Sequence, residues 1–217
     1  MYKLILFLFL GLGVSLYAEK ISAYKIDVTV KQSGELFIVE SILYDFENAS
    51  KHGIFRDIPF TVKINSHTTN LILDTFSVKL DDGVVEWDAM TVNNTLAGKT
   101  TRIKIGSAST YLTGEHLYKI SYRVQKGVLP AVQNEKNDAV RWNVIGTGWQ
   151  VPIANIEANF YLPASLTQDA VELSTYTGSF GTKNSTATSH WVNPLHLQVK
   201  VGSLLPFEGT TVELAYP

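Results

Sequence analysis

The sequence predicts an all-β fold, an antiparallel β-sandwich of two packed sheets that follows an N-terminal signal segment. Apolar and polar residues alternate with a period of two in several stretches, which is typical of strands with one buried face. Turn sequences such as DDG, NNTLAGK and SFGTKNS separate these stretches at short intervals, as they do in sandwiches. No stretch of a dozen residues shows the 3.6-residue period of an amphipathic helix.

The first 18 residues have the pattern of a signal peptide or an uncleaved N-terminal anchor. Lys3 precedes an apolar run from Leu4 to Leu16, and the small residue Ala18 suits the last position before cleavage. The run is shorter than the roughly 20 apolar residues of a spanning helix. We therefore expect an exported protein, periplasmic or at the cell surface and either free or membrane-anchored, with a single β-sandwich domain over residues 19–217.

The first two strands are predicted at residues 22–31 and 36–46, joined as a hairpin by the turn QSGE. The first alternates strictly, so one of its faces is expected to be buried. The second is apolar on both faces except for Glu40 and Ser41. We therefore expect it to lie centrally in its sheet, with a covering layer on each side.

Ten further strands follow from the same pattern. They are expected at residues 60–64, 71–80, 84–88, 101–105, 115–124, 139–144, 150–162, 171–176, 195–201 and 210–216. Residues 125–138 could be a linker between two domains or one long loop of a sandwich. A single domain is the preferred interpretation, because each half would have only about 100 residues.

Composition excludes several classes of function. The chain of 217 residues has a net charge of −2, so it lacks the basic surface that nucleic-acid binding requires. It has no cysteine, which excludes thiolate chemistry. Its five histidines are spaced too irregularly to converge on a metal as i, i+4 or i, i+2 pairs. We therefore expect no nucleic acid, no metal and no cofactor.

One motif, KHGIFRDIPFTVKI at residues 51–64, places two charges inside an apolar run. Arg56 shares its face with two isoleucines, and a charge that is desolvated there needs a partner. Glu40, midway along an apolar strand, has the same need, so the two are predicted to form a structural ion pair. The alternatives are that Arg56, with Asp57, binds a carboxylate or phosphate of a partner, or that Asp57 or His52 is catalytic.

A second motif, RWNVIGTGWQVPI at residues 141–153, carries two tryptophans around a Gly-Thr-Gly turn or bulge. Trp142 and Trp149 could form an aromatic platform for a sugar ring or a peptide, with Asn143 as a polar contact. The alternative is that both indoles pack in the core. The Gly-x-Gly is no nucleotide-binding fingerprint, because no helix is expected after it.

These two motifs, together with YKIDVTVKQSGELFIVESILYDF, RIKIG and YKISYRV, carry a family resemblance. The chain from about Ile21 onward resembles the N-terminal domain of the predicted membrane proteins grouped as domain of unknown function 2207. The resemblance implies an extracytoplasmic β-sandwich attached to transmembrane helices, which are expected beyond Pro217. It implies no known chemistry, and it marks four positions as typical of the family without assigning their roles: Glu40, Arg56, Asn143 and Trp149.

The sequence therefore predicts a cell-envelope interaction or ligand-binding module of a membrane protein rather than an enzyme. Its candidate binding residues are Arg56, Asp57, Asn143 and Trp149, and its partner would be an envelope protein or a glycan. One alternative is an envelope hydrolase that acts on glycan or peptide, with Asp57, Glu115 or His116 at its site. Another is a purely structural domain of a membrane assembly.

Overall fold

The computed structural model describes residues 19–64, 67–94, 98–131 and 137–217. Nearly all of the regular structure in these ranges is β-strand, with one short 3₁₀ helix, η1, at Gln168–Ala170. The predicted all-β class is therefore confirmed. The expected signal segment at residues 1–18 and residues 132–136 of the expected linker lie outside the described residues.

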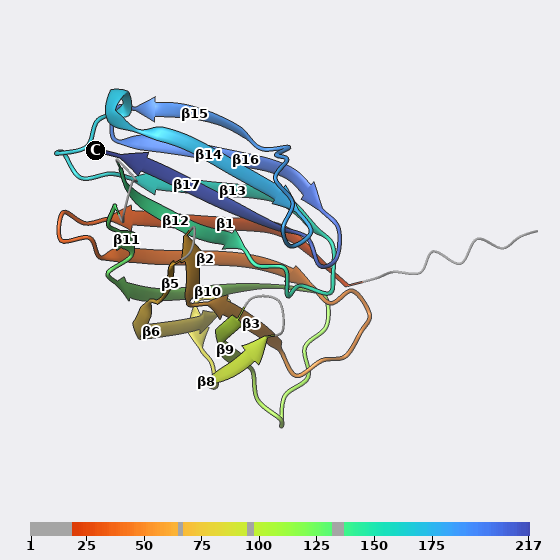
Figure 1. The fold of residues 1–217 in the computed structure, drawn as a ribbon. Coiled ribbons are helices and arrows are strands. Elements are labelled where there is room, and N and C mark those ends of the chain that lie inside the picture. Colours follow the sequence, from red (N-terminus) through yellow and green to blue (C-terminus); the bar gives the residue numbers. More distant parts are fainter. Residues whose placement is uncertain (1–18, 65–66, 95–97, 132–136) are drawn as a thin grey trace, which may run out of the picture.

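The largest sheet has eight strands in the order β15-β16-β13-β1-β2-β10-β6-β7 (Figure 1). It is antiparallel except for one pair, β1 with β13, whose strands run in the same direction. Its strands have these bounds: β1 Lys20–Val30, β2 Leu36–Asp45, β6 Ile72–Leu80, β7 Gly83–Val84, β10 Glu115–Gln125, β13 Ile153–Tyr161, β15 Thr188–Asn193 and β16 His196–Leu204.

Three smaller sheets complete the described part of the fold. A four-stranded sheet has the order β11-β12-β17-β14, with bounds Val128–Leu129, Asp138–Ile145, Gly209–Tyr216 and Glu172–Gly178. A three-stranded sheet has the order β3-β9-β8, with bounds Ile54–Pro59, Gly98–Ile105 and Trp87–Asn94. A two-stranded hairpin pairs β4 with β5, at Thr61–Ile64 and His67–Asn70.

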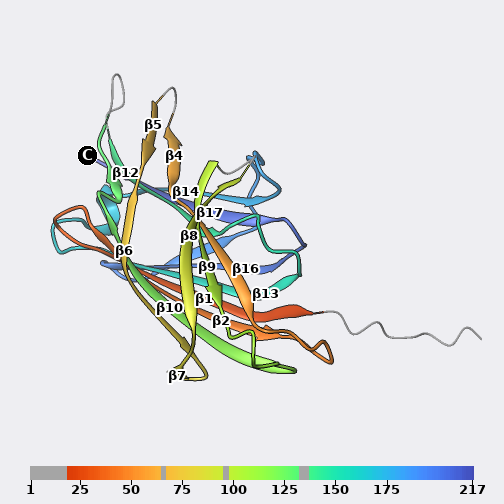
Figure 2. The same ribbon diagram turned by 90° about the horizontal axis from the view of Figure 1, so that it is seen from below.

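The four-stranded and three-stranded sheets pack side by side on one face of the large sheet (Figure 2). Trp142 of β12 contacts Tyr122 of β10, with ring centroids 6.3 Å apart. Arg56 of β3 reaches Glu40 of β2 on the same face. The core therefore lies between the large sheet and two smaller ones, and β3 sits where the two smaller sheets adjoin.

The expectation that β2 is covered on both faces was wrong. Every second residue from Leu36 to Tyr44 is buried, but Phe37 is 41% exposed and the residues between are only half-buried. On this second face Phe37 lies beside Thr29 and Arg123 of the neighbouring strands. The apolar residues of this face are therefore partly covered by long and polar side chains of the neighbouring strands, not by the second layer that was expected.

Strand bounds differ from expectation mainly near the sheet edges. The structure adds β3, β5, β11 and β15, extends β8 to Asn94, and starts β13 at Ile153, after a turn. β3 alternates between buried and less buried residues, but most of the other segments are short, exposed or irregular, so side-chain alternation is weak in them. No helix in the described residues is long and apolar enough to cross a membrane.

Candidate functional site

Arg56 and Glu40 form a buried ion pair between β3 and β2. The Arg56 Nε atom donates to Glu40 Oε2 at 2.7 Å, and Nη2 donates to Oε1 at 2.9 Å. The Arg56 and Glu40 side chains are only 1% and 0% exposed. Two parallel bonds of this kind fix both the distance and the orientation of the two strands.

Two tyrosines complete the surroundings of the Glu40 carboxylate. The Tyr24 hydroxyl donates to Oε2 at 2.5 Å and the Tyr122 hydroxyl donates to Oε1 at 2.6 Å. Burial raises the pKa of both tyrosines well above its usual value, so they remain donors. Burial alone would lower the pKa of Arg56, but the charge and hydrogen bonds of Glu40, together with Tyr24 and Tyr122, outweigh burial and raise that pKa.

The remaining nitrogen of Arg56 faces the second sequence motif. Nη1 donates to the backbone carbonyl of Asp57, and a Cβ added to Gly146 would lie 3.6 Å from both atoms. A Cβ added to Gly148 would lie 3.8 Å from the Asp57 side chain. The two motifs therefore meet, with β3 against the loop of residues 146–151 that follows β12.

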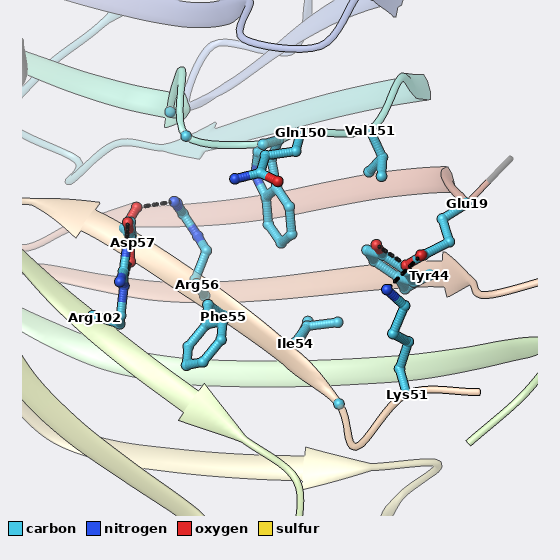
Figure 3. A pocket seen from close by; sticks show the side chains of 14 residues that line it. Glu19, Tyr44, Lys51, Ile54, Phe55, Arg56, Asp57, Arg102, Gln150 and Val151 are labelled. Carbon is cyan, nitrogen blue, oxygen red and sulfur yellow. Dashed lines mark hydrogen bonds and ion pairs between the residues drawn. The ribbon is translucent and has the colours of Figure 1, made fainter. Parts of the chain in front are cut away.

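A cleft of about 600 Å³ opens between β3 and this loop (Figure 3). We call it the β3 cleft. It is lined by Glu19, Tyr44, Lys51, Gly53, Ile54, Phe55, Arg56, Asp57, Arg102, Gly146, Gly148, Trp149, Gln150 and Val151. The two motifs supply most of this lining, although about 90 residues separate them in the sequence.

Each charged group that lines the β3 cleft has an oppositely charged partner, which for Arg56 is the buried Glu40. Arg102 donates from Nε and Nη2 to the two carboxylate oxygens of Asp57, each at 2.7 Å. The hydrogen bond to Asp57 raises the pKa of Arg102, whose guanidinium lies 5.4 Å from the ring centre of Phe55. At the other end, Lys51 Nζ lies 3.0 Å from Glu19, which also accepts from the Tyr44 hydroxyl at 2.9 Å.

The structure brings only three of the four candidate binding residues to the cleft. Arg56, Asp57 and Trp149 line it, whereas Asn143 is exposed elsewhere and accepts a hydrogen bond from Thr211 Oγ1 at 2.6 Å. Trp149 is 7% exposed and packs against Tyr24, with ring centroids 6.2 Å apart. Trp149 and Asn143 therefore do not form one joint platform.

The residues considered for hydrolysis are dispersed. Glu115 and His116 begin β10, and neither of them lines the β3 cleft. The His116 Nδ1 atom lies 2.7 Å from Asp81 Oδ2. His52 Nδ1 bonds the Thr110 carbonyl at 3.0 Å. In the described ranges no group of three His, Asp or Glu residues could hold a metal ion.

Several residues of the site did not stand out in the sequence. Tyr24 and Tyr122 occupy inward positions of alternating strands, and a buried tyrosine hydroxyl needs a partner, but the pattern does not say which one. The sequence also gave no signal that would place Glu19, Lys51 and Arg102 at one cleft. They come from segments that only the tertiary fold brings together.

Solved structures resemble this fold at low sequence identity. Native yeast LTA4 hydrolase matches with a TM-score of 0.54 and 11% identity, over 91% of this chain and 29% of that chain. A second structure, of native leukotriene A4 hydrolase from Saccharomyces cerevisiae, matches with a TM-score of 0.51 and 12% identity, over the same shares. At this identity the likeness concerns the fold alone.

A curated relative and a family model match the sequence itself. The uncharacterized protein YciQ of Escherichia coli (strain K12) is 24% identical over 175 residues, 76% of this chain and 25% of the relative. The chain thus spans about a quarter of that relative's length. The family model described as "Predicted membrane protein (DUF2207) N-terminal domain" matches residues 20–216. The chain therefore belongs to this family of membrane-protein N-terminal domains, as its motifs predicted.

Proposed function

We propose that this domain is an interaction module on the outer side of a cell-envelope membrane protein, and that a partner protein binds in the β3 cleft. The observation that carries the proposal is the meeting of the two sequence motifs at this cleft. The glycines of the loop, Gly146 and Gly148, bring its backbone close to β3, and both line the cleft. A purely structural domain has no need of such an open site.

The charges of the cleft favour binding over hydrolysis. Glu19 and Asp57, the acids that line the cleft, each have a cationic partner within 3.0 Å, Lys51 and Arg102. Hydrolysis by two acids needs one free carboxylate and one that holds a proton. Paired charges instead give a site with fixed geometry and little net charge.

A protein partner fits the cleft better than a glycan. A sugar ring is bound by stacking on an open aromatic face, and the indoles of Trp142 and Trp149 are only 2% and 7% exposed. The exposed ring that lines the cleft is Phe55, which is 55% exposed, and the Arg102 guanidinium lies over this ring.

Site-specific photo-crosslinking in the intact membrane protein tests this proposal. Gln150 is exposed and lines the cleft, so a photoreactive residue there should give a discrete adduct with an envelope protein. The same residue at Thr188, exposed on β15 outside the cleft, is the matched control and should give none. Equal labelling at both positions, or none at Gln150, would contradict the proposal.

A further inference from the structure

The strand β3 has one paired edge and one free edge. It lies at the end of its sheet, and β9 is its only strand partner in the described residues. The Phe60 N–H donates to the Lys99 carbonyl at 3.1 Å, in the same register that pairs Arg56 with Ile103. Hydrogen-bonded pairs alternate along an antiparallel ladder, so the even-numbered residues of β3 direct their backbone groups to β9.

The odd-numbered residues therefore direct their backbone groups into the β3 cleft. The Asp57 carbonyl confirms this direction, because it accepts from Arg56 Nη1 and lies beside Gly146. Phe55 N–H and C=O, and Asp57 N–H, have no backbone partner among the described residues. Backbone donors and acceptors with this regular spacing are complementary to another extended chain.

At Asp57 the opposite wall lies against β3, because Cβ atoms added to Gly146 and Gly148 would be 3.6 Å from the Asp57 carbonyl oxygen and 3.8 Å from its side chain. The part of the cleft left for such a chain therefore runs from Phe55 toward Lys51. The φ of Gly148 lies outside the left-handed region, so a larger residue can be placed there. Toward the Lys51 end the cleft is lined by Ile54, Trp149 and Val151. Alternate side chains of an added strand would face these apolar groups on one side and the Phe55 ring on the other.

We propose that an extended peptide segment of the partner protein adds as a strand to the free edge of β3. This inference rests on the proposed function and names its ligand class. Phe55 exchanges both backbone bonds with the peptide, while an apolar peptide side chain packs over Ile54 and Trp149.

The probe is a library of random peptides of about seven residues, selected on the purified full-length chain in detergent. Selected peptides are resynthesised with single N-methyl groups at each amide in turn. Strand addition predicts one sensitive amide, the one that bonds the Phe55 carbonyl, where the N-methyl group lowers affinity by about five- to tenfold, the value of one lost backbone bond. The amides next to it in the sequence point away from β3 and should tolerate the N-methyl group.

Two pairs of variants locate the peptide on the protein. Phe55→Pro removes the free-edge N–H, whereas Phe55→Ala removes the ring and keeps that N–H, so the proline variant should bind more weakly than the alanine variant. Gly148→Leu fills the cleft and should abolish binding. Gly202→Leu, at a β16 position with open space around it, should leave binding unchanged.

Three outcomes would overturn the inference. They are an N-methyl scan without a sensitive amide, peptides that bind Gly148→Leu as well as the unchanged chain, and a concentration-dependent dimer that Gly148→Leu abolishes, since that would assign the edge to a second copy. A Gln150 adduct together with a scan that lacks a sensitive amide would leave the proposed function in place and remove strand addition. The absence of a Gln150 adduct would remove both.

Discussion

At the scale of single residues, Glu40 is the centre of the buried polar cluster. Its carboxylate accepts four hydrogen bonds, two from Arg56 and one each from Tyr24 and Tyr122. A buried charge is tolerated only when its acceptor positions are filled in this way. The cluster ties β1, β2 and β10 of the large sheet to β3 of a smaller one, and so fixes one wall of the cleft.

Arg56→Ala should destabilise the fold strongly. The change leaves Glu40 buried without its counter-charge, which typically costs about 3–5 kcal/mol. Arg56→Lys keeps the charge but loses the two parallel hydrogen bonds. Its free energy of unfolding should therefore lie between those of the alanine variant and the unchanged protein. Chemical denaturation gives the free energies of unfolding, and an alanine variant that unfolds like the unchanged protein would show that the pair is not buried.

Tyr122→Phe removes one hydrogen bond to the Glu40 carboxylate and should cost about 1.5–3 kcal/mol, the usual value for a bond to a charged group. Tyr111→Phe is the matched control, because Tyr111 is 65% exposed, and it should change stability by less than about 0.5 kcal/mol. Thermal unfolding of both variants checks this. Similar changes in the two would mean that the Tyr122 hydroxyl makes no such contact.

Residue types alone pointed to the Glu40–Arg56 contact, because each is a single charge in an apolar run and each requires the other. The two tyrosine hydroxyls could not be assigned in the same way. Tyr24 reads as an ordinary inward residue of an alternating strand, and its partner comes from a different strand. The burial of Trp149 was one of two open alternatives, since a tryptophan beside glycines suits a core or a surface equally.

At the scale of elements, the start of β3 depends on two glycines that touch across the ladder to β9. A Cβ added to Gly53 would lie 1.9 Å from the Ile105 carbonyl oxygen, and one added to Gly106 would lie 1.9 Å from that of His52. Both glycines have positive φ, +139° and +126°. Only glycine permits this close approach of the two backbones.

Gly53→Ala should therefore displace the start of β3 and cost about 1–3 kcal/mol or more in backbone strain alone. Gly202→Ala, with no atom within 4 Å of the added Cβ and no positive φ, is the control and should be nearly neutral. The measurement is the melting temperature of each variant. Equal melting temperatures for the two variants would contradict the claim that only glycine fits at position 53.

Two strands whose sequences alternate strictly were predicted closely. The expected strands at 22–31 and 115–124 correspond to β1, Lys20–Val30, and β10, Glu115–Gln125, and every second residue is buried along most of both. β15 was missed because most of its residues are exposed. The parallel pairing of β1 with β13 joins distant segments, and local pattern carries no signal for it.

At the scale of the whole molecule, one large sheet supports two smaller ones, and the β3 cleft lies where these adjoin (Figures 1 and 3). All-β composition was enough to predict layered sheets. The division of the covering layer into separate sheets was not predictable, since it depends on which non-neighbouring strands pair. The cleft shares this non-local origin, because its walls come from different sheets.

The buried tyrosines make the fold sensitive to alkali. Burial raises the pKa of Tyr216 to about 12, and it raises the pKa of Tyr24 and Tyr122 well above the usual value, which is about 10 in an unfolded chain. Above about pH 10 the tyrosines of the unfolded chain lose protons that the folded chain keeps. Their contribution to the free energy of unfolding is therefore fully present below that pH and is lost as the pH rises. Tyrosinate absorbance and circular dichroism should therefore change together, and full ionisation of these tyrosines in a folded protein would contradict this.

The most direct measurement is amide hydrogen exchange, resolved by residue, along β3 of the folded chain without ligand. The Arg56 and Ile58 amides should be protected by β9, and the Phe55 and Asp57 amides should exchange much faster because they face the cleft. That alternation is the result expected for a strand anchored by its buried arginine and free along one edge. Equal protection of all four amides would show that the edge is already paired, and would remove the cleft as a binding site.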